Sequence, residues 1–221
     1  MTPAVAVMAK VPGLVPVKSR LHHSLAPEMA TLLYRCFLLD RLDALAALPR
    51  IHSVVAFTPA HGRRLMEALA PPGIRLVAQE GRDLGERLSN LLAALIADGH
   101  PGAMALDSDS PTLPMAHVLE AAEVLVGGAA DVVLGPSEDG GYYLVGLRRR
   151  QAALFDGIPW STDRVLDLTL EKAGRLGLRV HLLPSWFDVD TESDLRRLHE
   201  ELAGRSDGPV RTRRCLEAIY S

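Results

Sequence analysis

The order in which short apolar runs and longer helical patterns follow one another constrains this chain most. Runs of β-branched and small apolar residues alternate with segments whose apolar residues recur at helical spacing. Alternation with short connections is typical of a mostly parallel sheet covered by helices on both faces. In such sheets ligands bind beyond the carboxyl ends of the strands, so the loops at those ends are where chemistry is expected.

The two periodicities separate expected strands from expected helices along the whole chain. The expected strands cover 3–9, 51–57, 74–78, 103–106, 131–134, 142–147 and 178–183. The expected helices cover 27–48, 61–70, 83–97, 114–126, 163–176 and 192–202. No repeat, linker or low-complexity segment interrupts the pattern, so we expect a single domain over 1–221. Its C-terminal tail, from about 204 to 221, is expected to pack back as a short helix or to fray.

Composition excludes several classes of protein. Hydrophobic residues make up 48% of the 221 residues, enough for a substantial core, and the formal net charge of −3 gives no basic field for nucleic acid. The two cysteines suit a reducing compartment and have no metal-ligand spacing. The N-terminal apolar run is too short for a signal peptide, and no run of 18 apolar residues occurs. We therefore expect a soluble cytoplasmic protein without a membrane span.

The loop after the first expected strand reads AKVPGLVPVKSRL and is basic. It carries Lys10, Lys18 and Arg20, with Gly13 in the turn. Cations on a glycine-containing loop suit a polyphosphate, which is bound by backbone donors and point charges. The loop has neither the Walker nor the dinucleotide glycine pattern, and a solvated surface loop is the plain alternative.

The segment AQEGRDLGERL begins the third expected helix. Asp83, with Glu86 three positions later, resembles a capping box, and this cap alone explains both acids. The functional alternative is that the exposed amides at this helix start, with Gln79, contact a base or ribose. On this segment alone the cap is favoured.

The segment MALDSDSPTLP places two carboxylates at the end of a short apolar strand. Asp107 and Asp109 offer hard oxygen ligands of the kind that Mg²⁺ or Mn²⁺ binds together with water and substrate phosphates. The alternatives are that one aspartate caps the helix beginning near Pro114 or that both face solvent.

The segment SEDGGYYLVGL joins two expected strands. Asp139 precedes Gly140 and Gly141, which permit a tight turn or the close approach of a ligand. A hairpin turn explains these three residues without any function. Tyr142 and Tyr143 must face opposite sides of the strand that follows, so only one is expected to point into a cleft.

Two later segments add polar residues before helices. In IPWSTDRVL, Trp160 precedes Ser161 and Thr162, either of which could cap the next helix. In FDVDTESDL, Asp188 and Asp190 follow the last expected strand, and a cap is again the plain alternative. A second carboxylate brought near Asp109 by the fold would complete a two-sided metal site.

Taken together, six separated motifs resemble a family of bacterial GT-A-fold proteins, the nucleotide-diphospho-sugar transferase-like glycosyltransferases. The motifs are MAKVPGLVPVKSRL, QEGRDLGERL, LDSDSPTL, DVVLGPSEDGGYYLVGL, IPWST and DVDTESDL, which span nearly the whole chain. Some members are encoded near radical SAM enzymes and are associated with arsenosugar biosynthesis. The resemblance implies an α/β fold of the GT-A, nucleotide-diphospho-sugar transferase type, a Rossmann-like three-layer sandwich with a mostly parallel mixed sheet.

The resemblance also implies roles for individual residues. Asp109 matches the aspartate of the metal motif, and Asp190 matches a terminal acidic position that supplies a second metal contact in related nucleotidyltransferases. Asp107 stands where many relatives carry glycine, so it ranks below Asp109 as a ligand of Mg²⁺ or Mn²⁺. The nucleotide and phosphate candidates are Lys10, Gly13, Lys18, Arg20, Gln79, Asp83 and Gly85. The catalytic candidates are Asp139 and Tyr142, and the sugar or acceptor candidates are Gly140, Gly141, Trp160 and Ser161.

The implied activity is a metal-dependent transfer of a sugar from a nucleotide sugar to a small acceptor. The alternative is nucleotidyl transfer from a nucleoside triphosphate to a phosphorylated small molecule, because VKSRLHHSLAPEMATLL resembles the loop and helix of phospholactate guanylyltransferases. Molybdopterin-guanine dinucleotide guanylyltransferases share the broader fold. A binder of nucleotide sugars without catalytic activity is a third class. No nucleic-acid partner is expected, and a homodimer is left open.

Overall fold

The computed structural model describes residues 2–205 and 207–221 and contains one seven-stranded sheet. The strands are β1 Ala4–Lys10, β2 His52–Thr58, β3 Arg75–Ala78, β4 Ala103–Leu106, β5 Val132–Pro136, β6 Tyr142–Leu147 and β7 Val180–Leu182. The helices are α1 Pro27–Ala46, α2 Arg63–Leu69, α3 Leu84–Ala97, α4 Met115–Gly127, α5 Val165–Arg175, α6 Glu192–Leu202 and α7 Val210–Tyr220. Short 3₁₀ turns cover Ser19–His23, Ala60–Gly62 and Ala152–Leu154.

The strand order is β3-β2-β1-β4-β6-β5-β7, and most neighbouring pairs are parallel. Strand β6 is the exception, because it runs antiparallel to both β4 and β5. The α/β class with a mostly parallel mixed sheet is therefore confirmed. Since β1 to β4 all run the same way, the loops that follow them meet at one edge of the sheet.

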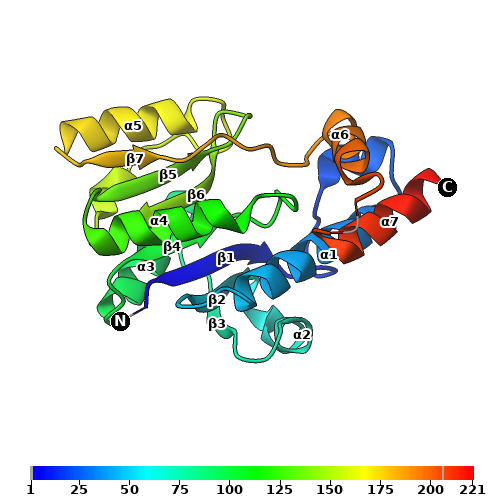
Figure 1. The fold of residues 1–221 in the computed structure, drawn as a ribbon, viewed down its shortest axis with the longest axis horizontal. Coiled ribbons are helices and arrows are strands. Elements are labelled where there is room, and N and C mark those ends of the chain that lie inside the picture. The colour runs from blue at the N-terminus through cyan, green and yellow to red at the C-terminus, as the bar shows by residue number, and fades with distance from the viewer. Residues whose placement is uncertain (1, 206) are drawn as a thin grey trace.

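Helices cover both faces of the sheet, and α6 and α7 lie beyond one end of it (Figure 1). One apolar cluster packs α1, α2 and α4 against the first face, and a second packs α3 and α5 against the other. A third cluster joins α1 to α6 and α7, which lie together at the end of the molecule far from α5. Alternate residues of the central strands feed the first two clusters, as a period of two requires.

Most expected elements form, and the shifts in their ends have local causes. Helix α1 ends at Ala46 rather than at 48, because Leu48 precedes Pro49 and a residue before proline is disfavoured in the helical region. Strand β7 ends at Leu182, two residues before Pro184, which has no N–H to donate to a ladder. The tail does form a helix, α7, which packs on α1. Within the described ranges, no helix has the length and hydropathy to cross a bilayer.

Candidate active site

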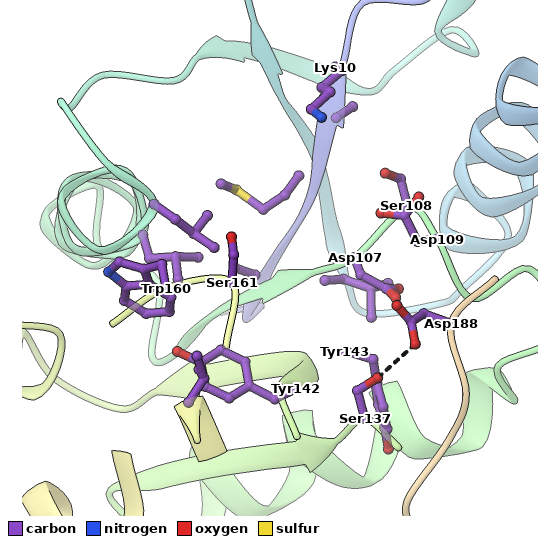
Figure 2. Close-up of a pocket in the computed structure, with 18 of the residues that line it drawn as sticks. Lys10, Asp107, Ser108, Asp109, Ser137, Tyr142, Tyr143, Trp160, Ser161 and Asp188 are labelled. Atoms are coloured by element: carbon purple, nitrogen blue, oxygen red, sulfur yellow. Dashed lines mark hydrogen bonds between the residues drawn. The ribbon is translucent and has the colours of Figure 1, made fainter. Parts of the chain in front are cut away.

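A cavity of about 570 Å³ opens where the carboxyl ends of the parallel strands meet (Figure 2). Lys10 ends β1, Thr58 ends β2, Gln79 follows β3 and Asp107 follows β4, and all four line the cavity. Residues from the β5–β6 turn, from the segment before α5 and from the loop before α6 complete the wall. The predicted site residues that line it are Lys10, Lys18, Gln79, Asp107, Asp109, Asp139, Gly141, Tyr142, Trp160, Ser161 and Asp190.

The buried ammonium group of Lys18 joins two of the predicted metal ligands. Its side chain is only 2% exposed, and Nζ forms ion pairs with Asp109 and, at 3.0 Å, with Asp190. Burial opposes the charge, but the two carboxylates together raise the pKa of Lys18 above its ordinary value. Arg20 lies at the rim, outside the lining, and its Nη1 reaches Asp190 Oδ2 at 3.4 Å. The fold therefore brings the β4 loop and the loop before α6 to one cation.

Asp107 lies deeper and is held differently from Asp109. Its Oδ2 accepts a hydrogen bond from Ser110 Oγ at 2.5 Å, and its Oδ1 is buried without a hydrogen-bond partner among the described residues. Burial raises the pKa of Asp107 to about 7, with Asp109 adding to the effect and Arg41 opposing it. The buried guanidinium of Arg41, near the C-terminal end of α1, also donates to the Ser110 carbonyl oxygen. Helix α1 thus fixes the loop on which both aspartates lie.

A further carboxylate, Asp188, completes an acidic wall. It accepts a hydrogen bond from Ser137 Oγ at 3.2 Å, and it lies on the same side of the cavity as Asp107 and Asp109 in Figure 2. Burial, together with the nearby carboxylates Asp139 and Asp190, raises the pKa of Asp188 to about 6. This crowding of like charges indicates that the wall has more negative charge than its own cations balance.

The donor set fits a divalent cation that shares its coordination shell with a substrate. The lining residues include five carboxylates but three cations, Lys10, Lys18 and Arg87. Carboxylate oxygens are the ligands that Mg²⁺ and Mn²⁺ take, usually with water and phosphate oxygens in the remaining positions. Across 2–205 and 207–221, no group of three or more His, Cys, Asp or Glu side chains is arranged to hold a metal by itself. Water or substrate oxygens would therefore have to supply part of the shell.

Opposite the acids, an aromatic wall closes the cavity (Figure 2). The rings of Tyr142 and Trp160 meet edge to face, with centroids 6.4 Å apart. The Tyr142 hydroxyl is buried and lacks a hydrogen-bond partner within the described part of the chain. Beside Trp160, Ser161 adopts a left-handed backbone conformation, φ 64°, which is uncommon outside glycine. This wall therefore offers the cavity the rings of Tyr142 and Trp160 and the hydroxyl of Ser161.

Glycines outside the lining shape the site indirectly. A Cβ on Gly85 would lie 2.7 Å from Trp160 Nε1, so this glycine makes room for the indole. A Cβ on Gly140, whose φ is 88°, would overlap the Asp163 carbonyl oxygen, so the turn between β5 and β6 can pack there only with glycine. Gly13, at φ 85°, turns the loop after β1 and also lies outside the lining.

Of the predicted site residues for which a helix cap was the alternative, Asp83 is a cap, whereas Asp109 and Asp190 are not. Asp83 Oδ1 accepts from the Glu86 N–H at 2.9 Å, which confirms it as the cap of α3, and it lies outside the lining. Helix α4 begins after Pro114 without a side-chain cap, and Thr191 caps α6, so neither Asp109 nor Asp190 is needed as a cap.

The expectation that Ser161 or Thr162 caps α5 is wrong. The cap position of this helix is Arg164, which makes no side-chain cap hydrogen bond. Thr162 instead donates to the Pro159 carbonyl at 2.8 Å, because a turn separates it from the helix. Gln79 is similarly committed to the scaffold, since its Nε2 donates to the carbonyls of Ala9 and Ala56 at 3.2 and 2.7 Å.

Residues 41–162, more than half of the chain, match the family described as "Uncharacterized protein conserved in bacteria (DUF2064)". The chain belongs to this family. A protein from Desulfovibrio desulfuricans G20, named provisionally as a nucleotide-diphospho-sugar transferase, has a similar sequence and structure. It is 33% identical over 99% of this chain and 97% of its own, with a TM-score of 0.90. No curated protein matches this DUF2064 chain.

More distant structures share only the fold with this DUF2064 protein. A CMP:2-keto-3-deoxy-manno-octonic acid synthetase in complex with CTP has a TM-score of 0.56 at 13% identity, covering 92% of this chain and 99% of its own. The glucosyl-3-phosphoglycerate synthase of Mycobacterium tuberculosis, in complex with Mn²⁺, UDP and glucosyl-3-phosphoglycerate, has a TM-score of 0.52 at 14% identity. That comparison covers 85% of this chain and 70% of the synthase.

Three residues that shape the site in this DUF2064 protein were not among the predicted site residues. Asp188 was noted beside Asp190 in the same strand-end loop, but no role in the site was assigned to it. Arg41 could have been found from helical spacing, since Phe37 and Leu45 put it on the buried face of α1. Tyr34 gave no signal, because an aromatic at that spacing is typical of a core. Its hydroxyl accepts a hydrogen bond from the N–H of Lys10, the last residue of β1, at 2.9 Å.

Proposed function

We propose that this protein is a metal-dependent glycosyltransferase that moves a sugar from a nucleotide-sugar donor to a small acceptor. The observation that carries the proposal is the ammonium group of Lys18 between Asp109 and Asp190, at the cavity where the strand ends meet. This arrangement combines a cation for phosphate with carboxylates for Mg²⁺ or Mn²⁺. The name of the 33% identical D. desulfuricans protein supports the same class of donor.

The basic loop would bind the diphosphate of the donor. Lys10 and Lys18 line the cavity, and Arg20 extends from the rim with a side chain that is 67% exposed. Asp109 and Asp190 would hold the divalent cation, so Lys18 would shift part of its pairing from these carboxylates to phosphate oxygens. When bound, the cation supplies a Lewis acid that neutralises charge developing on the departing nucleoside diphosphate.

The aromatic wall would receive the sugar. Tyr142 and Trp160 offer ring faces, and Ser161 offers a hydroxyl. Asp139 is exposed at the β5–β6 turn, where its Oδ1 accepts from the Gly141 N–H at 3.0 Å and its Oδ2 is available to a ligand. It would act as a base for the acceptor hydroxyl or as an anchor for a sugar hydroxyl. Tyr142 would contribute its ring rather than its buried hydroxyl.

Nucleotidyl transfer is the second candidate, and one observation favours it. Lys10, Lys18 and Arg20 place three cations around one end of the cavity, which suits a triphosphate as well as a diphosphate. The fold shared with a CTP-bound synthetase is compatible with this reaction. Release of pyrophosphate from a nucleoside triphosphate would distinguish it from glycosyl transfer.

The test is a thermal-shift and product screen of nucleotide sugars and nucleoside triphosphates, with Mg²⁺ or Mn²⁺ and with EDTA. We expect a nucleotide sugar to stabilise the protein only with metal, and its nucleoside diphosphate to be released slowly. Asp109→Asn should reduce metal-dependent donor binding at least tenfold. Asp98→Asn, which removes an exposed carboxylate paired with Arg75 at the end of α3, is the matched control. Unchanged donor binding by Asp109→Asn would contradict the assignment.

A further inference from the structure

The basic side chains of the cavity lining all come from one half of it, although Asp107 and Asp109 also lie in that half. The cations that line it, Lys10, Lys18 and Arg87, all come from the part of the chain that forms β1, its loop and α3. Arg20 at the rim belongs to the same part. The lysine and arginine side chains that can bind the phosphate groups of a donor therefore belong to this half.

The other half is built from residues that follow β5 in the chain. Its described lining contains no lysine, arginine or histidine, and its charged members are Asp139, Asp188 and Asp190. Asp190 is paired with Lys18 and Arg20, so Asp139 and Asp188 are the carboxylates that remain for a ligand. The guanidinium of Arg197, on α6, does not alter this, because it is paired with Glu138 at 2.6 Å and stacks 3.9 Å from the Phe187 ring. The described lining of the second half thus contains carboxylates and no cation of its own.

The remaining lining of this half suits a hydroxylated molecule. Tyr142 and Trp160 present ring surfaces, while Ser137, Ser161 and Thr162 bring hydroxyl groups. Ring faces pack against the C–H surface of sugars and polyols, and ionised carboxylates are strong acceptors for O–H donors. A cavity wall of this composition recognises hydroxyl groups by accepting their hydrogen bonds.

We propose that the acceptor is an uncharged polyhydroxylated small molecule and that phosphorylated acceptors are excluded from this half of the cavity. The inference rests on the proposed glycosyl transfer. In the reaction an acceptor hydroxyl oxygen bonds to the anomeric carbon of the donor, and the bond from that carbon to the diphosphate oxygen breaks. The diphosphate leaves with the electron pair, and the hydroxyl proton passes to Asp139 or to water.

Exclusion of a phosphate follows from charge. A phosphate monoester placed beside Asp139 and Asp188 would meet like charges. The lining cation near Asp188 is Lys18, which is already engaged by Asp109 and Asp190 and, in the proposed reaction, by the donor diphosphate, so the ester would lose its hydration without gaining a free cationic partner. A neutral alcohol of the same shape loses little on entering and gains hydrogen bonds to both carboxylates. This surface therefore favours an alcohol over the phosphate ester of the same alcohol.

The experiment compares matched pairs in the full chain with Trp186→Phe, which leaves Trp160 as the sole tryptophan. The protein is saturated with Mg²⁺ and UDP, or with the diphosphate of whichever nucleotide sugar binds best. Trp160 emission is then titrated with D-glucose against D-glucose 6-phosphate, and with glycerol against glycerol 3-phosphate. We expect each phosphate ester to bind at least tenfold more weakly than its alcohol.

A variant with an added positive charge makes the test independent of the absolute affinities, because only the change in affinity for the phosphate esters is compared. Thr162→Arg adds a cation to the second half, and it should tighten binding of the phosphate esters at least tenfold. Thr31→Arg, on the exposed side of α1, is the control, and with it each alcohol should still bind more tightly than its phosphate ester. Tighter binding of a phosphate ester than of its alcohol by the unsubstituted site, or no gain from Thr162→Arg, would overturn the inference. Failure of metal-dependent donor binding would instead refute the proposed function and leave these binding results intact.

Discussion

At the scale of single residues, the position of Lys18 links the stability of the protein to its metal. Its ammonium group compensates Asp109 and Asp190, so Lys18→Met should leave Asp109 without a counter-ion and Asp190 with only the exposed Arg20. We expect a loss of roughly 1–3 kcal/mol in EDTA, less than for a fully buried pair because both carboxylates are partly exposed. Adding Mg²⁺ should raise the melting temperature of this variant by more than it raises that of the wild type.

Thermal melts of both proteins in EDTA and in Mg²⁺ measure this difference. The control is Lys172→Met, which removes an exposed lysine on α5 that donates to the Asp156 carbonyl. An equal response to Mg²⁺ in all three proteins would mean that Lys18 and a cation do not share the two carboxylates.

Gly85 gives a second prediction at this scale. Replacing a glycine inside a helix by alanine ordinarily stabilises it by roughly 0.5–1 kcal/mol. At Gly174, in α5, an added methyl group would meet no atom within 4 Å apart from its chain neighbours and the backbone of its own helix, so Gly174→Ala should show this gain. Gly85→Ala should not, because its methyl group would lie 2.7 Å from the Trp160 indole and must displace it. We expect shifted Trp160 fluorescence, weaker ligand binding and no gain in urea denaturation.

At the scale of elements, the attachment of α7 to α1 depends on one carboxylate. Asp40, on α1, accepts hydrogen bonds from the N–H groups of Arg211 and Thr212 at 3.2 and 2.8 Å, which are the first-turn donors of α7. Asp40→Asn removes the charge that favours this helix start and should cost roughly 1–3 kcal/mol. Asp43→Asn, which loses only an exposed pair with Arg211, should cost no more than about 0.5 kcal/mol.

Urea denaturation gives the two free energies, and limited proteolysis reports whether α7 detaches first. Release of the C-terminal segment should be faster in Asp40→Asn than in Asp43→Asn. Equal cleavage of the two variants would show that apolar packing in the third cluster, rather than the Asp40 cap, holds the helix.

The elements were largely predictable from the sequence, whereas several contacts were not. Strands β4 and β6 and helix α6 have the expected ends, because apolar periodicity and turn residues act locally. The meeting of Asp109 with Lys18 and Asp190 was predictable only in outline, from the rule that strand-end loops converge. The roles of Gln79 and Tyr34 depend on where their side chains end in three dimensions, which periodicity does not encode.

At the scale of the whole molecule, the sheet should make the two faces unfold together. Each central strand supplies side chains to both the first and the second apolar cluster, so neither face can lose its packing while the other keeps it. Trp160 packs against the second cluster and Trp186 against the first and third, so the two tryptophans report on different parts of one proposed domain over 1–221.

The single-tryptophan variants Trp160→Phe and Trp186→Phe allow this to be measured. Urea transitions followed by fluorescence in each variant should coincide with the far-UV circular dichroism transition of the same variant. Because each fluorescence curve is compared with circular dichroism of its own variant, any stability change from the substitution cancels. A Trp186 transition that precedes loss of secondary structure would indicate that α6 and α7 unfold as a separate unit. In that case the loop carrying Asp188 and Asp190 would lose its position before the rest of the site, and donor binding should fail at the same urea concentration.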